Sequence, residues 1–234
     1  MSYVTPSNWM ADMGRQSGIT ANEFRVIPNG VDTELFRPRD RRRLREKLGL
    51  PDDKPLILVS AGSILDERKG SVFAVEALRR LGDTPFALLL IGNMNEAAHR
   101  MLSGLEYHAP GYLGESRELA RYYACADLFL CCSLADNLPL VILETMSSGV
   151  PTVGFATGGI PDMIEQNRCG YLVEQRDIDG LVEGLKLALV DGLAVRWGEE
   201  ARTRAVSHFS FDRFLQNHLD FYQELLEGRD GVGG

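Results

Sequence analysis

The sequence has few cysteines, no long apolar run and no excess of basic residues, and each of these absences excludes a class of protein. No segment approaches the roughly 20 apolar residues that a membrane-spanning helix needs. A net charge of −8 and a pI near 5.1 argue against a protein whose main task is non-specific nucleic-acid binding, because that task requires a net basic face. The N-terminus MSYVTPSNWM lacks the basic-then-apolar order of a secretory signal. We therefore expect a cytoplasmic protein without a nucleic-acid partner.

The four cysteines show no pattern of a metal or redox site. They are Cys125, Cys131, Cys132 and Cys169, with no C-x-x-C pair and no histidine at zinc-finger spacing. Free cysteine behaves as a small hydrophobic residue and is often buried. We expect four buried, reduced thiols.

Short apolar runs recur along a chain of 234 residues that is 44% hydrophobic and 25% charged, which is enough for a sizeable core. Runs bounded by turn residues predict strands buried on both faces. They are residues 56–61, 86–91, 128–132 and 152–155, with weaker ones around Tyr112 and at 171–173.

Helical patterns lie between and after these runs. They cover residues 71–81, 96–105, 116–124, 140–147, 161–165, 178–189, 193–207 and 211–227. Strands alternating with helices predict a parallel sheet, because parallel neighbours need a crossover. The fold class is therefore α/β, a Rossmann-like doubly wound parallel sheet with helices on both faces and additional C-terminal helices. We place one domain at 26–227 and a disordered tail at 228–234.

The first 25 residues look like the end of another unit. Tyr3–Thr5 could form a strand and Ala11–Gln16 a turn of helix, yet the globular pattern starts only near Phe24. The segment from Arg37 to Lys47 then carries seven basic residues against two acidic ones. Its apolar positions are few and isolated, which favours a solvated linker and helix, and an anionic membrane surface or acidic ligand is the alternative.

Ligands of an open α/β sheet bind beyond the carboxyl ends of the strands, so the loops after the strands are the candidate site. The first loop, GSILDERKG at 62–70, has Gly at both ends and places Arg68 and Lys69 directly before a helix. Two cations and a helix N-terminus can hold phosphate oxygens. An ordinary exposed turn has the same composition.

The second loop, SLADNLPLVILE at 133–144, leaves a strand and enters a helix announced by Asp136, Asn137 and Pro139. Asp136 could be a helix cap. Glu144 follows three apolar residues, where an unpaired carboxylate is costly, and helical side chains tilt toward the N-terminus, so it faces the strand ends. It could accept hydrogen bonds from two ribose hydroxyls. In the third loop, 155–164, Gly158 and Gly159 permit a tight turn with or without a ligand.

Taken in order, these loops resemble retaining glycosyltransferases of GT-B fold, in the group often called family 4, which includes bacterial lipopolysaccharide and capsule enzymes. The resemblance rests on these segments: VTPSNWMADM, VIPNGVDTELFRP, RKG, GYLGESRELARYYACADLFLCCS, DNLPLVILETMSSGVPTVGFATGGIPDMI, GYLV and FYQELL. It covers nearly the whole chain. A single piece would be weak evidence, whereas the ordered set is specific.

The resemblance implies a set of donor-binding residues. The family's E-x7-E segment corresponds to Asp136-x7-Glu144, with the first acid shortened as in a subgroup of polysaccharide enzymes. Asp136 would contact the sugar, helped by backbone N–H groups of Asn137, Leu138 and Leu140, and Glu144 the ribose. Lys69 matches the family's diphosphate-binding lysine. Ser63, after Gly62, replaces the expected arginine, and Arg68 would take over that charge. The base would lie against Tyr112, Leu113 and Gly114.

The implied reaction transfers a hexose from a UDP- or GDP-sugar to an acceptor hydroxyl with retention, and needs no cofactor or metal. Asp177-Ile178-Asp179 has the form of a metal-binding D-x-D motif, but helix capping and dipole complementarity account for it. The family's N-terminal acceptor lobe is missing, so we expect the donor-binding half of an enzyme, weak or inactive alone. The alternatives are a non-catalytic nucleotide-sugar-binding module and an epimerase or phosphorylase. Peripheral contact with the inner face of a membrane is left open.

Overall fold

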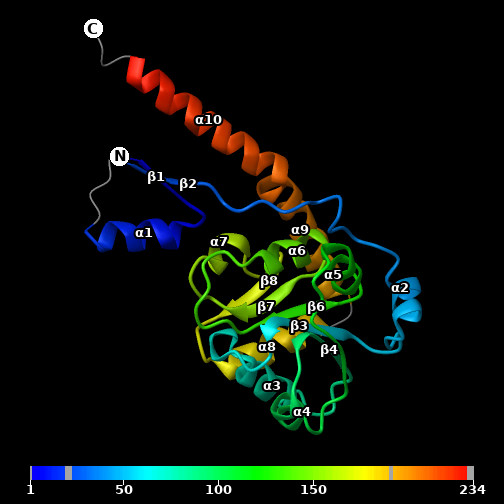
Figure 1. Ribbon diagram of the computed structural model, residues 1–234. Helices are drawn as coiled ribbons and strands as arrows, with labels where there is room; N and C mark the ends of the chain where they lie inside the picture. Colours follow the sequence, from blue (N-terminus) through cyan, green and yellow to red (C-terminus); the bar gives the residue numbers. More distant parts are fainter. Residues whose placement is uncertain (1, 19–22, 190–191, 231–234) are drawn as a thin grey trace.

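The computed structural model describes residues 2–18, 23–189 and 192–230 (Figure 1). The strands are β1 (Ser2–Thr5), β2 (Glu23–Val26), β3 (Leu56–Ser63), β4 (Ala87–Asn93), β5 (Tyr107–Gly111), β6 (Leu128–Cys131), β7 (Thr152–Phe155) and β8 (Gly170–Val173). The helices are α1 (Asn8–Gln16), α2 (Arg41–Leu48), the single 3-10 turn η1 (Glu67–Lys69), α3 (Ser71–Arg79), α4 (Glu96–Met101), α5 (Ser116–Tyr123), α6 (Leu140–Ser147), α7 (Ile160–Met163), α8 (Ile178–Leu189), α9 (Leu193–Phe209) and α10 (Phe211–Asp230).

Six strands form one parallel sheet in the order β5-β4-β3-β6-β7-β8. Successive side chains of a strand point to opposite faces, so one strand supplies two cores. Leu56 and Leu58 of β3 face α5, α6 and α9, whereas Ile57 and Val59 face α3, α4 and α8. The Rossmann-like doubly wound sheet that the apolar runs predict is confirmed.

The order in which successive strands are added to the sheet changes direction at β3, although all six strands are parallel. From β3 the chain moves outward through β4 to β5, then returns to the other side of β3 and continues through β6, β7 and β8. The loops after β3 and β6 therefore diverge from adjacent strand ends. This is the topological switch point at which open α/β sheets bind ligands.

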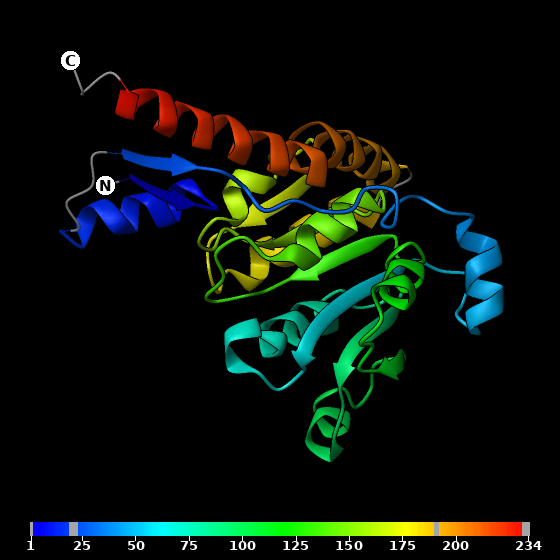
Figure 2. The same ribbon diagram turned by 45° about the horizontal axis from the view of Figure 1, so that its top comes forward.

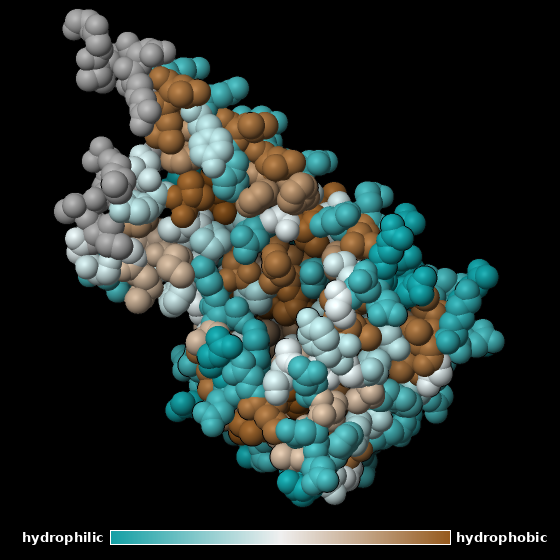
Figure 3. Space-filling view, viewed as in Figure 1, coloured by the Kyte–Doolittle hydropathy of each residue, from teal (hydrophilic) through white to brown (hydrophobic). Residues whose placement is uncertain are grey.

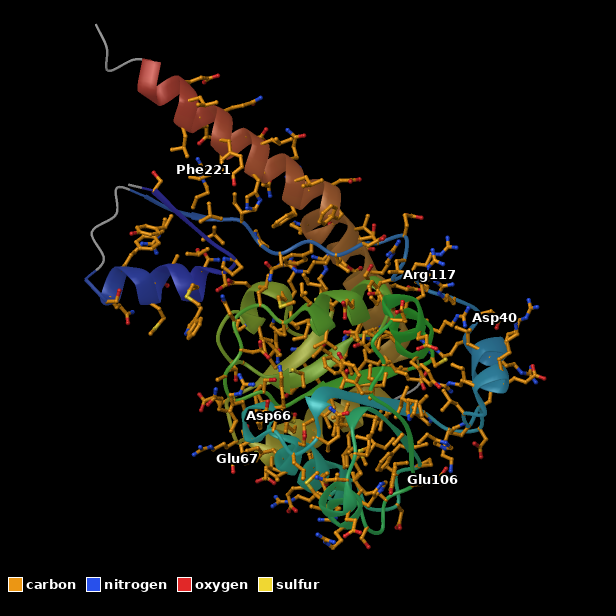
Figure 4. The ribbon with its side chains drawn as sticks, in the orientation of Figure 1. Asp40, Asp66, Glu67, Glu106, Arg117 and Phe221 are labelled. Atoms are coloured by element: carbon orange, nitrogen blue, oxygen red, sulfur yellow. The ribbon has the colours of Figure 1, made fainter. Side chains whose placement is uncertain are left out.

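The N-terminal residues form a separate unit. β1 and β2 pair in parallel as a two-stranded sheet connected through α1, and this unit lies beside α10, away from the main sheet (Figure 2). Phe221 of α10 points toward it, with the Arg25 guanidinium 5.5 Å from the ring centroid, and Arg25 also pairs with Glu224 (Figure 4). The strand and helix predicted here are thus present, as one β-α-β unit.

The segment that connects this unit to the main domain is hydrogen-bonded to the junction of α9 and α10. The Val31 N–H donates to the Phe209 carbonyl at 2.8 Å, and the Phe211 N–H donates to the Val31 carbonyl at 3.0 Å. The segment leaving β2 and the start of α10 therefore run side by side.

The basic segment departs from the prediction at Arg45. That side chain is only 4% exposed and contacts Asp127 at 2.6 Å and the Cys125 carbonyl at 2.7 and 2.9 Å. Asp127 also accepts from Arg41 and from the Leu56 N–H at the start of β3. The predicted solvated helix is present as α2, with most of its side chains exposed, but Arg41 and Arg45 fasten it to the main domain.

Other predictions hold with shifted boundaries. All four cysteines are free and buried, as expected. The strand expected around Tyr112 ends at Gly111, and the helices expected to reach Leu81 and Leu105 end at Arg79 and Met101. Helix α10 continues to Asp230, and the rest of the predicted tail lies outside the described residues. Within the described residues, no helix is long and apolar enough to cross a membrane.

Candidate functional site

The loops after β3 and β6 meet through an ion pair between Lys69 and Asp136. The Lys69 ammonium lies 2.6 Å from a carboxylate oxygen of Asp136, and the two side chains are 28% and 19% exposed. A backbone hydrogen bond of 2.7 Å from the Leu134 N–H to the Arg68 carbonyl joins the same loops. A cation and an anion that face solvent together at the switch point form the centre of the candidate site.

Gly70 makes this close approach possible. Its φ of +63° is in the left-handed region, and a Cβ at this position would lie 2.1 Å from the Cys132 carbonyl oxygen. Only glycine tolerates both conditions without movement of the β6 end. The final Gly of the RKG segment therefore sets the position of Lys69.

Asp136 is not a helix cap. The N-cap of α6 is Pro139, and no side chain makes a capping bond there. The alternative in which Asp136 merely starts the helix is wrong, because its carboxylate is bound to Lys69 instead.

Glu144 is a largely buried carboxylate on α6. Within the described residues it makes no side-chain hydrogen bond or ion pair, and burial raises its pKa from 4.5 to about 7. Its charge is felt by Tyr123, whose pKa is raised mainly by its own burial and whose hydroxyl lies 3.3 Å from Ser60 Oγ. A buried carboxylate without a donor is destabilising by itself, and it is available to accept hydroxyl hydrogen bonds from a ligand.

Ser71 belongs to the site and was not singled out in the sequence. It is the first residue of α3, its hydroxyl is buried without a hydrogen-bond partner among the described residues, and it lines a small cavity of about 10 Å³ with Lys69 and Ser60. Buried hydroxyls are nearly always hydrogen-bonded. The available signal was a serine placed directly after RKG, at a helix N-terminus.

Arg68 pairs with Asp66 and makes no hydrogen bond to Asp136 among the described residues. Arg68 is 72% exposed and donates through two guanidinium nitrogens to Asp66, at 2.9 and 3.3 Å. Figure 4 places Asp66 at the loop that follows β3. Ser63 accepts a hydrogen bond from the Leu65 N–H at 3.3 Å, and Gly62 beside it is exposed. That Arg68 replaces the arginine expected at Ser63 stays a prediction.

The remaining predicted residues fall into two groups. Gly158 and Gly159 pack against the acidic loop, since Cβ atoms there would lie 1.8 Å from the Asp136 carbonyl oxygen and 2.2 Å from that of Asn137. Leu138 is buried and Leu140 is exposed on the first turn of α6. Tyr112 and Leu113 follow the edge strand β5, two strands away from the ion pair, with Tyr112 exposed and Leu113 packed on the core.

The D-x-D segment acts at a helix start. Asp177 accepts a hydrogen bond from the Gly180 N–H at 2.9 Å, and Asp179 pairs with Arg80 at 3.0 Å. The two carboxylates therefore have different partners. The capping interpretation of Asp177 is confirmed.

Residues 40–204 match the family described as glycosyl transferases group 1. A sulfoquinovosyl transferase of Arabidopsis thaliana is 32% identical over 186 residues, which cover 77% of this chain and 36% of that protein. Two solved structures share the fold. Sucrose-phosphate synthase from Thermosynechococcus elongatus has a TM-score of 0.85 and 24% identity, covering 97% of this chain and 59% of that one. Anabaena HepE in complex with UDP and glucose has a TM-score of 0.81 and 20% identity, covering 94% and 62%. The chain spans about half the length of most curated relatives it matches.

Proposed function

The chain belongs to the group 1 glycosyl transferases of GT-B type, and on that premise we propose that it binds a nucleoside-diphosphate sugar as the donor half of a retaining hexosyltransferase. The observation that carries this proposal is the Lys69–Asp136 pair at the switch point of the sheet, with the unpartnered carboxylate of Glu144 on the adjoining helix. The expected role is in cell-surface polysaccharide or lipopolysaccharide synthesis.

Each group of the site suits one part of the donor. Lys69, the Ser71 hydroxyl and the N-terminus of α3 offer positive charge and hydrogen-bond donors to the diphosphate. Glu144 accepts from the ribose hydroxyls. Asp136 and Asn137 face the sugar, while Arg68 adds a cation at the rim and Tyr112 and Leu113 border the base. Because a diphosphate is more highly charged than a carboxylate, it can displace Asp136 from Lys69.

The chemistry follows from that arrangement. The bond between the anomeric carbon and the phosphate oxygen breaks with its electron pair going to the diphosphate, and the acceptor oxygen bonds to the same face of that carbon. Negative charge grows on the leaving diphosphate, so the cation and helix N-terminus stabilise the transition state more than the bound donor. These groups neutralise the leaving group without a metal ion.

The N-terminal unit supports the proposal that the chain is one half of an enzyme. Parallel sheets are normally large and covered on both faces, and a two-stranded sheet is marginal alone. β1 and β2 form such a pair, and apolar side chains run along exposed α10, among them Phe211, Leu219 and Tyr222 (Figure 3). A further α/β lobe that extends this sheet would supply the acceptor site. Catalysis by this half alone would be weak or absent.

The two-stranded sheet and the exposed apolar side chains of α10 also favour one alternative, a nucleotide-sugar-binding or assembly module that needs a separate partner lobe. In either case we expect a cytoplasmic location, with peripheral membrane contact through the complete protein. Adding a separately expressed acceptor lobe distinguishes the two. Restored sugar transfer supports the enzyme, and unchanged inactivity supports the module.

Calorimetric titration of UDP, GDP and ADP tests donor binding. Lys69→Ala and Glu144→Gln should each weaken binding of the best-binding nucleotide by about tenfold or more, since a hydrogen bond to a charged group contributes about 1.5–3 kcal/mol. Lys54→Ala is the matched control, because Lys54 pairs with Glu106 at the opposite end of β3. EDTA should leave binding unchanged. Equal affinities in wild type and both variants would refute the site.

A further inference from the structure

Ser7 connects the N-terminal unit to the loop proposed to hold the donor sugar. Its side chain is fully buried, and its hydroxyl donates to the Asn137 side-chain oxygen at 2.5 Å across 130 residues of sequence. The same hydroxyl oxygen accepts the Met10 N–H at 3.1 Å and so caps α1. One hydroxyl therefore serves the start of α1 and the residue after Asp136.

The surrounding contacts hold this hydroxyl in place. The Asn8 N–H donates to Asp162 of α7 at 2.7 Å, so the first turn of α1 also touches the third loop. Gly159 lies beside both Ser7 and Asn137, because a Cβ there would be 2.6 Å from Ser7 Cβ and 2.2 Å from the Asn137 carbonyl oxygen. Asn29, on the segment leaving β2, donates to the Leu138 carbonyl at 3.3 Å. Two parts of the N-terminal region, at Ser7 and at Asn29, are thus hydrogen-bonded to residues 137 and 138.

The hydrogen bond from Ser7 also fixes the orientation of the Asn137 amide. Its oxygen is occupied by the Ser7 hydroxyl, and within the described residues its nitrogen has no hydrogen-bond partner. Asn137 is partly exposed and adjoins Asp136. An amide held by its oxygen presents its two N–H donors elsewhere, and a sugar hydroxyl is an acceptor that suits them.

We propose that Ser7 is a positioning residue for the donor sugar and that it acts through Asn137, whose amide it orients. Through this contact, the placement of the N-terminal unit is coupled to sugar binding. The inference rests on the proposed function, because it assumes that the loop at 136–138 faces the sugar. The nucleotide is held by Lys69, Ser71 and Glu144, none of which bonds to Ser7. Loss of the Ser7 hydroxyl should therefore affect the sugar and spare the nucleotide.

The test compares the affinity of each nucleotide with that of its sugar, using UDP with UDP-glucose, GDP with GDP-mannose and ADP with ADP-glucose. For the pair that binds best, Ser7→Ala should weaken the nucleotide sugar about fivefold to tenfold and leave the nucleotide within twofold. Ser17→Ala is the matched control, because among the described residues the Ser17 hydroxyl donates to the Gly14 carbonyl, at the other end of α1. It should change neither affinity.

A double-mutant cycle separates positioning from a loss of helix capping. Asn137→Ala removes the partner amide, so adding Ser7→Ala to it should cost no further sugar affinity. Additive losses, or equal weakening of nucleotide and nucleotide sugar by Ser7→Ala, would overturn the inference and leave the proposed function standing. Wild-type protein that binds a nucleotide without preferring any of the three sugars would also overturn it. Failure of all three nucleotides to bind would refute the proposed function as well.

Discussion

Replacing Glu144 by glutamine should stabilise the ligand-free protein at alkaline pH and weaken its nucleotide binding. The carboxylate is largely buried without a partner, and its pKa rises from 4.5 to about 7 on folding. The folded state thus binds the proton more tightly than the unfolded state. The unfolding free energy must fall as pH rises from about 4.5 through 7, and it levels off above about 8.

The size of this effect follows from the pKa difference. A shift of about 2.5 pKa units corresponds to about 3 kcal/mol. Glutamine has nearly the shape of protonated glutamate but cannot ionise, so Glu144→Gln should match wild type near pH 4.5 and exceed it by about 3 kcal/mol at pH 9. For a chain of this length, that is about 6–12 °C in melting temperature.

Thermal unfolding followed by circular dichroism between pH 4.5 and 9 measures the difference. Glu118→Gln, at an exposed position of α5, is the matched control and should leave the pH dependence unchanged. With UDP, or whichever nucleotide binds best, added at saturating concentration, this difference should narrow by about 1.5–3 kcal/mol, because wild type gains the hydrogen bonds that glutamine makes poorly. Stability curves of wild type and Glu144→Gln that run parallel across this pH range would refute the interpretation that burial without a partner raises the pKa of Glu144.

Three further predictions concern other contacts. Arg45→Met should lower the unfolding free energy by about 3 kcal/mol in a denaturant titration, because it removes a buried cation and leaves the Asp127 carboxylate, 20% exposed, short of one partner. Exposed Arg42→Met should cost under about 1 kcal/mol, and equal effects would contradict the anchoring role. Asp136→Asn should tighten binding of the nucleotide alone by several-fold in calorimetry, because it frees Lys69. Weaker binding would show that Asp136 does not compete with the diphosphate for Lys69. Gly158→Ala should destabilise by more than about 2 kcal/mol, since its Cβ would meet a carbonyl oxygen at 1.8 Å, whereas Gly82→Ala, at a similar φ in open space, should show only the strain of about 1 kcal/mol in the same titration.

The main sheet could be predicted from sequence where burial shapes the composition. Strands β3, β4, β6 and β7 are covered on both faces and are therefore nearly continuous apolar runs. β5 is an edge strand with the sequence YHAPG, so its apolar signal is weak and its position was expected too late in the chain. Several predicted helix ends differ from the observed ones by a few residues, because the final turns of a helix carry no distinct sequence pattern.

The parts of the site that could not be predicted depend on partners distant in sequence. Nothing in the run of arginines distinguishes Arg45, whose burial is set by a carboxylate 82 residues away. Ser7 has an ordinary capping composition, and its second partner lies 130 residues away. Glu144 could be singled out because an acid among apolar residues is unusual locally, whereas the composition around Lys69 also suits an exposed turn and the family resemblance singled it out.

The paired connections at Val31 and Phe209–Phe211 constrain how the N-terminal unit can move. One covalent segment joins the unit to the main domain, and its Val31 is hydrogen-bonded on both sides to the junction of α9 and α10. Moving the unit away from the main domain would also break the bonds from Ser7 to Asn137, from Asn8 to Asp162 and from Asn29 to Leu138. Ser7 therefore lies at the contact that fixes the position of the N-terminal unit relative to the loop at 136–138, so a disturbance on either side of this contact would be transmitted to the other.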